Sequence, residues 1–188
     1  MTRSRLQQSG TTLIEVLVTL IIIAFGLLGL AGLQVRLQQT EFEADQRTQA
    51  LLLLSDMADR IAVNRNAALT YVTTAASPVG AGMTCPTDVS TVQKADIAEW
   101  CNALQGAAET TSGGASVGVM TGGRGCIEEI STNQYMVTVA WQGTTPVSAP
   151  PSTVACGKDL YDGTTGSACT NDRCRRVVTT VVRVGNLL

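Results

Sequence analysis

The sequence has no histidine and few aromatic residues, and both shortages narrow the functions open to it. None of its 188 residues is histidine, which excludes Ser/His/Asp and Cys/His catalytic arrangements and histidine-ligated metal sites. Aromatic residues make up 4% of the chain and hydrophobic residues 45%, so the apolar content is largely aliphatic. We therefore expect a chain that is not an enzyme and has no cofactor and no metal site.

The chain also lacks an excess of positive charge. Its formal net charge is −2 and its calculated pI is about 5.1, which gives no basic surface of the kind that binds nucleic acid through phosphates. Its length suits one modest globular domain with an extension and argues against two large domains.

Residues 1–84 contain no cysteine, whereas the rest of the chain contains six. This partition indicates an oxidised domain outside the cytoplasm. A zinc site would need Cys-x-x-Cys-type pairs, and even the closest spacing has four intervening residues. We therefore interpret the cysteines as candidates for structural disulfides, and six cysteines allow 15 connectivities. They are Cys85, Cys101, Cys126, Cys156, Cys169 and Cys174.

Residues 13–33 are apolar except for Glu15 and Thr19. As a helix this segment spans about 30 Å, the thickness of one bilayer core. Arg3 and Arg5 precede it without an acidic residue, which predicts a cytoplasmic N-terminus and an exported C-terminal part. An ordinary secretory signal fits poorly, because the apolar run is too long and continues into a charged helical stretch.

Glu15 stands near the start of this apolar run and needs a physical reason. A carboxylate deep in the membrane costs about 2.5–3.5 kcal/mol, and less near the interface. One interpretation is that Glu15 snorkels to the surface or is protonated there. The other is that it pairs with a positive group.

The residues around Glu15 favour the second interpretation. Residues 9–16, Ser-Gly-Thr-Thr-Leu-Ile-Glu-Val, closely resemble the class III signal of type IV prepilins and type II secretion pseudopilins. The resemblance implies cleavage between Gly10 and Thr11 by a prepilin peptidase, N-methylation of Thr11, and a role for Glu15 in filament assembly beside the amine of a neighbouring subunit. Thr11 stands where the family usually has phenylalanine or methionine. An amine and a carboxylate from adjacent subunits would relieve each other's desolvation.

Gly26, Gly29 and Gly32 recur at every third position of the apolar segment. They lie on one slowly drifting stripe of a helix, where a neighbouring helix could approach closely. Glycine is also common in membrane helices without such a role, so both interpretations stay open.

The helix is predicted to continue as an amphipathic stalk to about Asn66. Asp56 and Arg60 on it form a predicted i,i+4 ion pair, and its charges in general are expected to be solvated. Residues 26–34 and 49–61, followed by Asn64 and Arg65, look like minor pilins of the PilV type, the type IV pilus modification subunits. The apolar positions that repeat at helical intervals are Leu33, Leu37, Ala44, Leu51, Leu54, Ala58 and Ile61.

The residues after the stalk are predicted to form a small domain that contains both helix and strands. Residues 67–82 have loop composition, and residues 92–105 are predicted to form a helix. Residues 126–130 and 135–142 are predicted to form an antiparallel hairpin with a turn at 131–134. The second strand of this hairpin alternates like a half-buried strand. Residues 177–184 predict the next strand, and residues 143–173 a long loop. The predicted helix has an apolar stripe of Ile97, Trp100, Cys101 and Leu104.

The cysteine positions, together with the resemblance to pilins, lead to three expected disulfides. Cys101 on the helix stripe suggests a tether to Cys85. In pilins the C-terminal region is a disulfide-bounded exposed loop, and we expect Cys156 with Cys169 and Cys126 with Cys174. Asp159, Asp162 and Gly163 weakly suggest a calcium loop, but the alternating acidic ligands of a stronger motif are missing, so we expect a polar turn.

Together these features predict an α+β, type IV pilin-like fold, in which a long N-terminal helix packs on a small antiparallel sheet with disulfides. The expected layout is a leader at 1–10, a membrane and filament-core helix at 11–33, an amphipathic helix at 34–66 and a periplasmic head at 67–188. The expected function is that of a minor pilin that initiates, caps or modifies pilus assembly, with a secretion pseudopilin as the alternative and a membrane-anchored periplasmic enzyme as the least favoured.

The resemblance also implies a location and partners. The chain is expected in the inner membrane before assembly, with its head in the periplasm, and then in the pilus near its tip. Expected partners are the prepilin peptidase, other minor pilins, the major pilin and a tip adhesin, with no nucleic acid.

Overall fold

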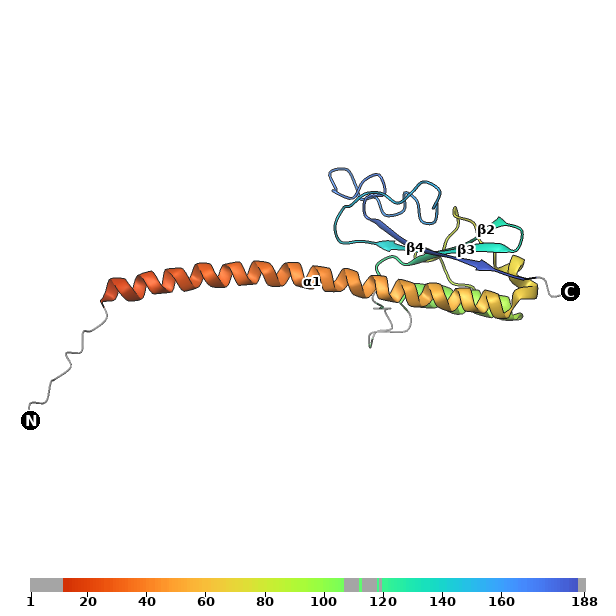
Figure 1. Cartoon of the computed structure of the whole chain (residues 1–188), viewed down its shortest axis with the longest axis horizontal. Coiled ribbons are helices and arrows are strands. Elements are labelled where there is room, and N and C mark those ends of the chain that lie inside the picture. The colour runs from red at the N-terminus through yellow and green to blue at the C-terminus, as the bar shows by residue number, and fades with distance from the viewer. Residues whose placement is uncertain (1–11, 107–111, 113–117, 119, 186–188) are drawn as a thin grey trace, which may run out of the picture. The chain divides into compact units, whose positions relative to one another are not determined.

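The computed structural model describes residues 12–106, 112, 118 and 120–185 (Figure 1). The chain divides into two compact units, Met1–Glu41 and Phe42–Leu188. In chain order the elements are α1 (Leu13–Val63), the 3-10 helix η1 (Arg65–Tyr71), β1 (Val79–Gly80), α2 (Val92–Leu104), β2 (Arg124–Ser131), β3 (Gln134–Gln142) and β4 (Arg175–Arg183).

Helix α1 ends at Val63, three residues before the predicted end of the stalk at Asn66. The chain then tightens into η1, which corrects the prediction of a loop after residue 66. Ala68 and Tyr71 of η1 are buried in the main core. Two buried residues in so short a segment give no readable period, and this is why the sequence pattern missed η1.

In the second unit, the buried stripe of α1 agrees with the prediction at Leu54 and Ile61 and differs from it elsewhere. The buried residues are Gln46, Ala50, Leu53, Leu54, Met57 and Ile61. Leu51 was assigned to the buried stripe, yet its side chain is 47% exposed. Residues 51–54 are four consecutive leucines, so the apolar pattern fits more than one helix face, and only the partner surface decides between them.

The sheet is antiparallel with strand order β1-β2-β3-β4, and Figure 1 labels β2, β3 and β4. Strands β2 and β3 form the predicted hairpin, and Asn133 in its turn has φ 60°, a left-handed conformation that asparagine tolerates. β4 begins at Arg175, two residues before the prediction, and pairs with β3 over nine successive positions. The predicted fold class, a long apolar helix with a small antiparallel sheet and disulfides, is confirmed.

Strand β3 is buried on both faces, although alternation predicted a half-buried strand. Its Tyr135, Val137, Val139 and Trp141 belong to the main core with α1 and α2. Ala140 belongs to a second cluster with Cys126, Cys156 and Tyr161. The chain after β3 therefore covers the face that the sequence pattern assigned to solvent.

Helix α2 agrees with its prediction. The hydroxyl of Thr91 caps it by accepting a hydrogen bond from the Lys94 backbone N–H at 3.2 Å. The indole N–H of Trp100 donates to the backbone oxygen of Leu53 at 3.0 Å, which attaches α2 to α1. The predicted stripe of Ile97, Trp100, Cys101 and Leu104 is buried, as expected.

Gly125 on β2 makes room for Trp100, and this gives a first prediction. A Cβ atom at residue 125 would overlap the Trp100 ring, which is 1% exposed and cannot move into solvent. We expect Gly125→Ala to lower the free energy of unfolding by about 1–3 kcal/mol, the usual cost of overpacking. Urea unfolding of the full chain in detergent measures it, with Gly185→Ala as the control because nothing lies near its Cβ. Equal stability of the two variants would contradict this packing.

Candidate assembly site

The predicted processing site lies at the boundary of the described chain. Gly10 and Thr11, predicted for cleavage and N-methylation, fall outside the described residues. The backbone oxygen of Thr12 accepts hydrogen bonds from the N–H groups of Glu15 at 3.0 Å and Val16 at 3.3 Å. The first helical turn therefore begins directly after Thr12.

Glu15 occupies this first turn of α1. The unpaired N–H groups at a helix N-terminus carry partial positive charge, which favours a carboxylate there. Glu15 is the only charged residue from Leu13 to Val35, and its side chain is exposed. The Thr19 hydroxyl donates a hydrogen bond to the backbone oxygen of Val16 at 2.8 Å. Within the described residues, the Glu15 carboxylate has no hydrogen-bond or ion-pair partner.

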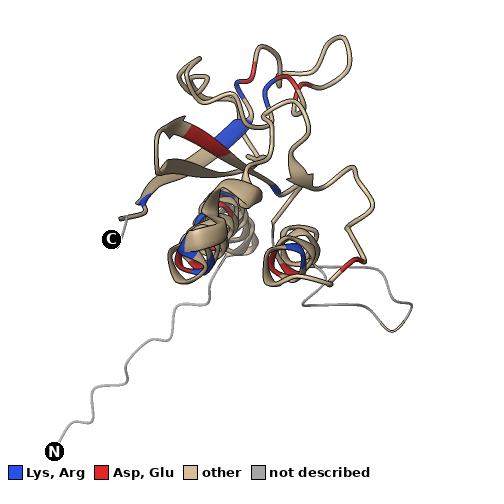
Figure 2. Ribbon diagram, turned by 90° about the vertical axis from the view of Figure 1, so that its right-hand side faces the viewer, with Lys and Arg blue, Asp and Glu red and all other residues tan. Residues whose placement is uncertain are grey.

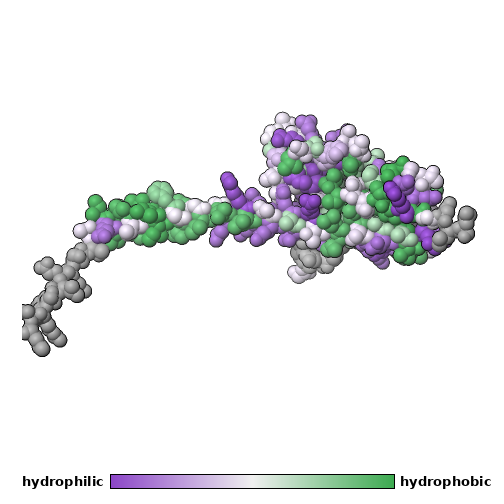
Figure 3. Space-filling view, viewed as in Figure 1, coloured by the Kyte–Doolittle hydropathy of each residue, from purple (hydrophilic) through white to green (hydrophobic). Residues whose placement is uncertain are grey.

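The helix around Glu15 presents apolar side chains on all sides. Leu13 is 84% exposed and Phe25 71% exposed, and the apolar window has a mean hydropathy of 2.7 with none of it buried. Figure 3 shows this segment as nearly continuous green, whereas the rest of the described surface is mixed. By length and composition this helix can cross a membrane. A helix that is apolar all round needs an apolar environment, either lipid or other helices.

Gly26, Gly29 and Gly32 keep open space around them. A Cβ atom built at each has no heavy atom within 4 Å apart from the helix's own neighbouring backbone. This space suits a neighbouring helix, yet it is equally what an isolated helix shows, so the interpretation of the glycine stripe remains a prediction.

In the second unit, Arg60 of α1 joins the two helices through three carboxylates. Its guanidinium lies 3.0 Å from Asp56, 2.7 Å from Asp96 and 2.8 Å from Glu99. The predicted Asp56 pair is confirmed, but no local pattern indicated the two partners on α2. Burial lowers the pKa of Arg60, and the bonds to Glu99, Asp96 and Asp56 outweigh it and raise the pKa. Figure 2 shows α1 and α2 side by side, with acidic and basic residues on both.

Tyr71 of η1 belongs to the same network. Its hydroxyl donates to the Asp96 carboxylate and accepts a hydrogen bond from the Asn64 side-chain amide at 2.9 Å. Burial of Tyr71, together with its bond to Asp96, raises its pKa to about 12. Because the fold favours the neutral phenol, this contribution to stability is complete below pH 10 and is lost as the pH rises from 10 toward 12.

Replacing this phenol provides a second prediction. We expect Tyr71→Phe to lower the free energy of unfolding by about 1–2 kcal/mol at pH 7, because Asp96 loses a donor. Absorbance titration of the tyrosines should also lose a phase near pH 12. Tyr135→Phe is the matched control, since the described residues give the Tyr135 hydroxyl no hydrogen bond. A Tyr71→Phe variant as stable as that control would show that the hydroxyl contributes little.

Glu43 and Gln46 attach α1 to distant parts of the chain. The Glu43 carboxylate accepts hydrogen bonds from the Thr144 N–H at 3.0 Å and the Thr144 hydroxyl at 2.6 Å. These bonds, and the Arg176 guanidinium at 3.6 Å, lower the pKa of Glu43 against the effect of its partial burial. The fully buried Gln46 accepts from the Thr121 N–H at 3.1 Å. Glu43 is one of the stalk charges that were expected to be solvated, so its bonds to Thr144 correct that expectation.

All six candidate cysteines form disulfides. Cys85 pairs with Cys101, the suggested pairing. The other two predicted pairs were wrong, because Cys126 pairs with Cys156 and Cys169 with Cys174. Cys126 points from β2 into the second core cluster, where Cys156 is also buried, and this burial fixes the pairing. Cys169 and Cys174 then close a short loop of their own.

The suspected calcium loop is held by the protein itself. The Asp162 carboxylate accepts from the N–H groups of Asn171 at 3.0 Å and Asp172 at 2.8 Å. Asp172 in turn pairs with the buried Arg175 at 3.1 Å. Asp162 and Asp172 thus order this loop, and the described residues contain no cluster of three or more acidic, cysteine or histidine side chains suited to a metal.

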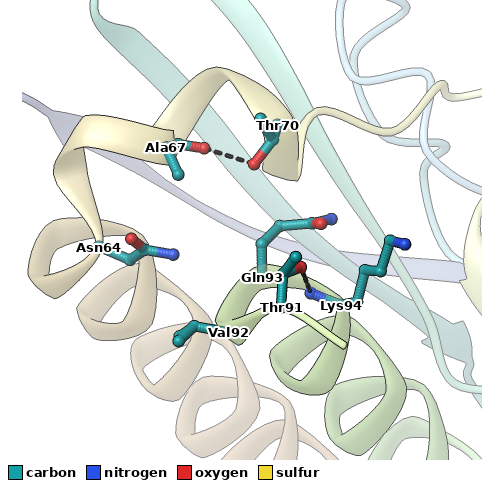
Figure 4. A pocket seen from close by; sticks show the side chains of 7 residues that line it. All are labelled: Asn64, Ala67, Thr70, Thr91, Val92, Gln93 and Lys94. Atoms are coloured by element: carbon teal, nitrogen blue, oxygen red, sulfur yellow. Dashed lines mark hydrogen bonds between the residues drawn. The ribbon is translucent and has the colours of Figure 1, made fainter. Parts of the chain in front are cut away.

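A hollow of about 460 Å³ lies between η1 and the start of α2 (Figure 4). Its polar groups are used locally, since the Thr70 hydroxyl donates to the Ala67 oxygen and Thr91 caps α2. The Lys94 ammonium pairs with Asp88 at 2.6 Å. Its lining residues are Asn64, Ala67, Thr70, Thr91, Val92, Gln93 and Lys94.

Two protein families match adjoining parts of the chain. Residues 32–108 match the family described as Type IV pilin Tt1218, and residues 5–31 match the prokaryotic N-terminal methylation motif. No curated protein and no solved structure gave a significant match. The two family matches support a type IV pilin with a role in a pilus or pseudopilus, and pilins are in general structural and non-catalytic. The methylation motif implies processing by a prepilin peptidase and assembly with other pilins.

Proposed function

We propose that the chain is a non-catalytic minor pilin that initiates, caps or modifies the assembly of type IV pili. The observation that carries this proposal is an exposed apolar helix with a lone carboxylate in its first turn, directly after a processing motif. The similarity of residues 26–34 and 49–61 to PilV-type subunits favours a minor pilin over a major one. Its biological roles would be pilus biogenesis, twitching motility and adhesion.

The proposed pathway begins in the inner membrane. Residues 11–33 anchor the precursor with its N-terminus in the cytoplasm, and residues 67–188 form a periplasmic head that packs on residues 34–66. The peptidase removes residues 1–10 by cutting between Gly10 and Thr11, and the new amine of Thr11 is methylated. The apolar helix then leaves the lipid for the filament core, which exchanges one apolar environment for another.

In this proposal, Glu15 sets the register between neighbouring subunits in the filament core. In a filament core both the new amine and the carboxylate would lose water, and each alone would carry a large desolvation cost. Pairing Glu15 with the N-terminal amine of a neighbouring subunit, and the Thr11 amine with a neighbour's carboxylate, offsets both costs. The support from this chain is that Glu15 has no partner within its own described residues. The neighbours would be other minor pilins and the major pilin, with a tip adhesin beyond them.

A type II secretion pseudopilin is the second candidate, because pseudopilins share the same processing motif. Deletion of the gene separates the two functions. We expect the deletion strain to lose surface pili and twitching, measured by shearing and immunoblotting, and to recover both with the wild-type gene. Normal piliation with exoproteins trapped in the periplasm would instead assign the chain to secretion.

A further inference from the structure

The two edges of the sheet differ in length and regularity. The β1 edge is only two residues long, Val79–Gly80, and offers little to another strand. The β4 edge is nine residues long and pairs with β3 without a register shift, whereas the β2–β3 ladder is interrupted between Glu129 and Ser131. The β4 edge is therefore long and regular.

The hydrogen bonds that flank the β3–β4 ladder show which backbone groups face outward. Gly143 N–H donates to the Cys174 oxygen at 2.8 Å, and Val184 N–H donates to the Asn133 oxygen at 2.9 Å. In an antiparallel ladder, hydrogen-bonded and non-bonded positions alternate along the strand. The backbone N–H and C=O groups of even-numbered residues 174–184 therefore face β3. The N–H and C=O groups of Val177, Thr179 and Val181 face away from β3. Within the described residues, no hydrogen bond reaches them.

The side chains along this edge do not protect it. Residues 177–182 are Val-Val-Thr-Thr-Val-Val, with no charge and no proline, and Val181 is 45% exposed. Edge strands usually carry lysine, proline or a bulge that blocks further pairing. Arg183 at the end of β4 is exposed and has no ion-pair partner among the described residues.

We propose that the outer edge of β4 binds an extended segment of another protein by antiparallel strand addition. Unpaired backbone groups at three alternate residues match the repeat of a strand, so main-chain bonds would supply the affinity. The uncharged stretch would favour β-branched residues in the partner. Arg183 would select a carboxylate near the N-terminal end of the segment, which an antiparallel strand places opposite the end of β4.

A second copy of this chain is a poor occupant. Two β4 edges pair antiparallel only around a two-fold axis, which reverses the direction of the α1 residues packed on each sheet. Chains anchored in one membrane enter it in the same direction, so this exclusion rests on the proposed function. The other free edge of a second copy, β1, has only two residues to offer.

A designed peptide tests the edge directly. The probe is a short fluorescent peptide of alternating valine and threonine with one glutamate near its N-terminus, added to the full chain in detergent. We expect saturable binding by fluorescence anisotropy, and slower hydrogen exchange at the amides of Val177, Thr179 and Val181. Absence of binding, or protection elsewhere in the chain, would overturn the proposal.

Matched variants separate strand addition from adhesion to an apolar surface. Thr179→Pro removes an outward N–H and no bond to β3, so we expect affinity to fall about tenfold, whereas Thr179→Val should bind normally. Arg183→Glu should reverse the preference between the glutamate peptide and a lysine version. Equal binding by Thr179→Pro and Thr179→Val would overturn the proposal.

Two further measurements complete the test. A peptide N-methylated at the amides that face β4 should bind the unaltered chain about tenfold more weakly, a result that needs no folded variant. Sedimentation of the unaltered chain without peptide should show no self-association through β4. Self-association that Thr179→Pro abolishes would instead identify a second copy of the chain as the occupant of the edge. Neither result depends on leader processing, so this proposal can fail while the proposed function stands.

Discussion

Replacing Glu15 with valine is expected to give a chain that is cleaved normally but is excluded from filaments. If the proposed pairing holds, the variant leaves the N-terminal amine of a neighbouring subunit without its counter-charge in an apolar core. Loss of one partner of a buried ion pair costs about 3–5 kcal/mol, and about 1.4 kcal/mol is a tenfold change. We therefore expect the amount of this chain in sheared pili to fall by about a hundredfold or more, measured by quantitative immunoblotting.

The control for this experiment is another carboxylate on the same helix. Glu41 is exposed and lies beyond the apolar run, so Glu41→Gln should enter pili normally. The Glu15 variant should have the mature size in the membrane fraction, which separates failed assembly from failed processing. Recovery of Glu15→Val in pili at the level of Glu41→Gln would rule out the proposed role of Glu15.

Replacing Gly10 with valine is expected to block cleavage, so that the precursor accumulates in the membrane with its leader attached. A glycine before the cut lets the backbone approach a peptidase closely, and a branched side chain does not. We expect almost all of the chain to remain at precursor size, measured by mass spectrometry of the membrane fraction. Pili should contain almost none of it, because the Thr11 amine is never formed.

A leader substitution away from the proposed cut controls for altered expression. Gln7→Leu adds bulk to the leader at a distance from Gly10 and should be processed normally. If Gly10→Val gave the same mature mass as Gln7→Leu, the cut would not lie after Gly10.

Sequence patterns predicted correctly those helices whose position depends only on residues close together in the chain. The apolar run after Arg3 and Arg5 predicted the start of α1, since composition alone decides the environment of such a helix. The stripe of Ile97, Trp100 and Leu104 predicted α2 because its period matches one helix face.

The features that failed depend on contacts between distant residues. Gln46 is buried because it meets the Thr121 N–H, and nothing near Gln46 in the sequence shows that partner. Alternation predicted an open face on β3, but the chain that carries Cys156 and Tyr161 covers it. The two wrong disulfide pairs have the same origin, because loop length alone does not tell which cysteine reaches Cys126.

The same limit applies to the candidate site. The processing motif and Glu15 could be recognised from the sequence because the chemistry lies in a few consecutive residues. The network of Arg60, Tyr71 and Asp96 joins three elements, and only its Asp56 pair lies within one helix. The β4 edge could not be recognised at all, because strand order and bonding phase appear only in the folded sheet.

Determination of the N-terminal residue of the natural protein, purified from membranes and from sheared pili, tests the central claim most directly. The proposed function predicts a chain that begins at Thr11 and keeps the whole apolar helix, with Glu15 as the fifth residue of the mature protein. A product that still begins at Met1, or one that has lost the apolar helix as a conventional export signal, would contradict it.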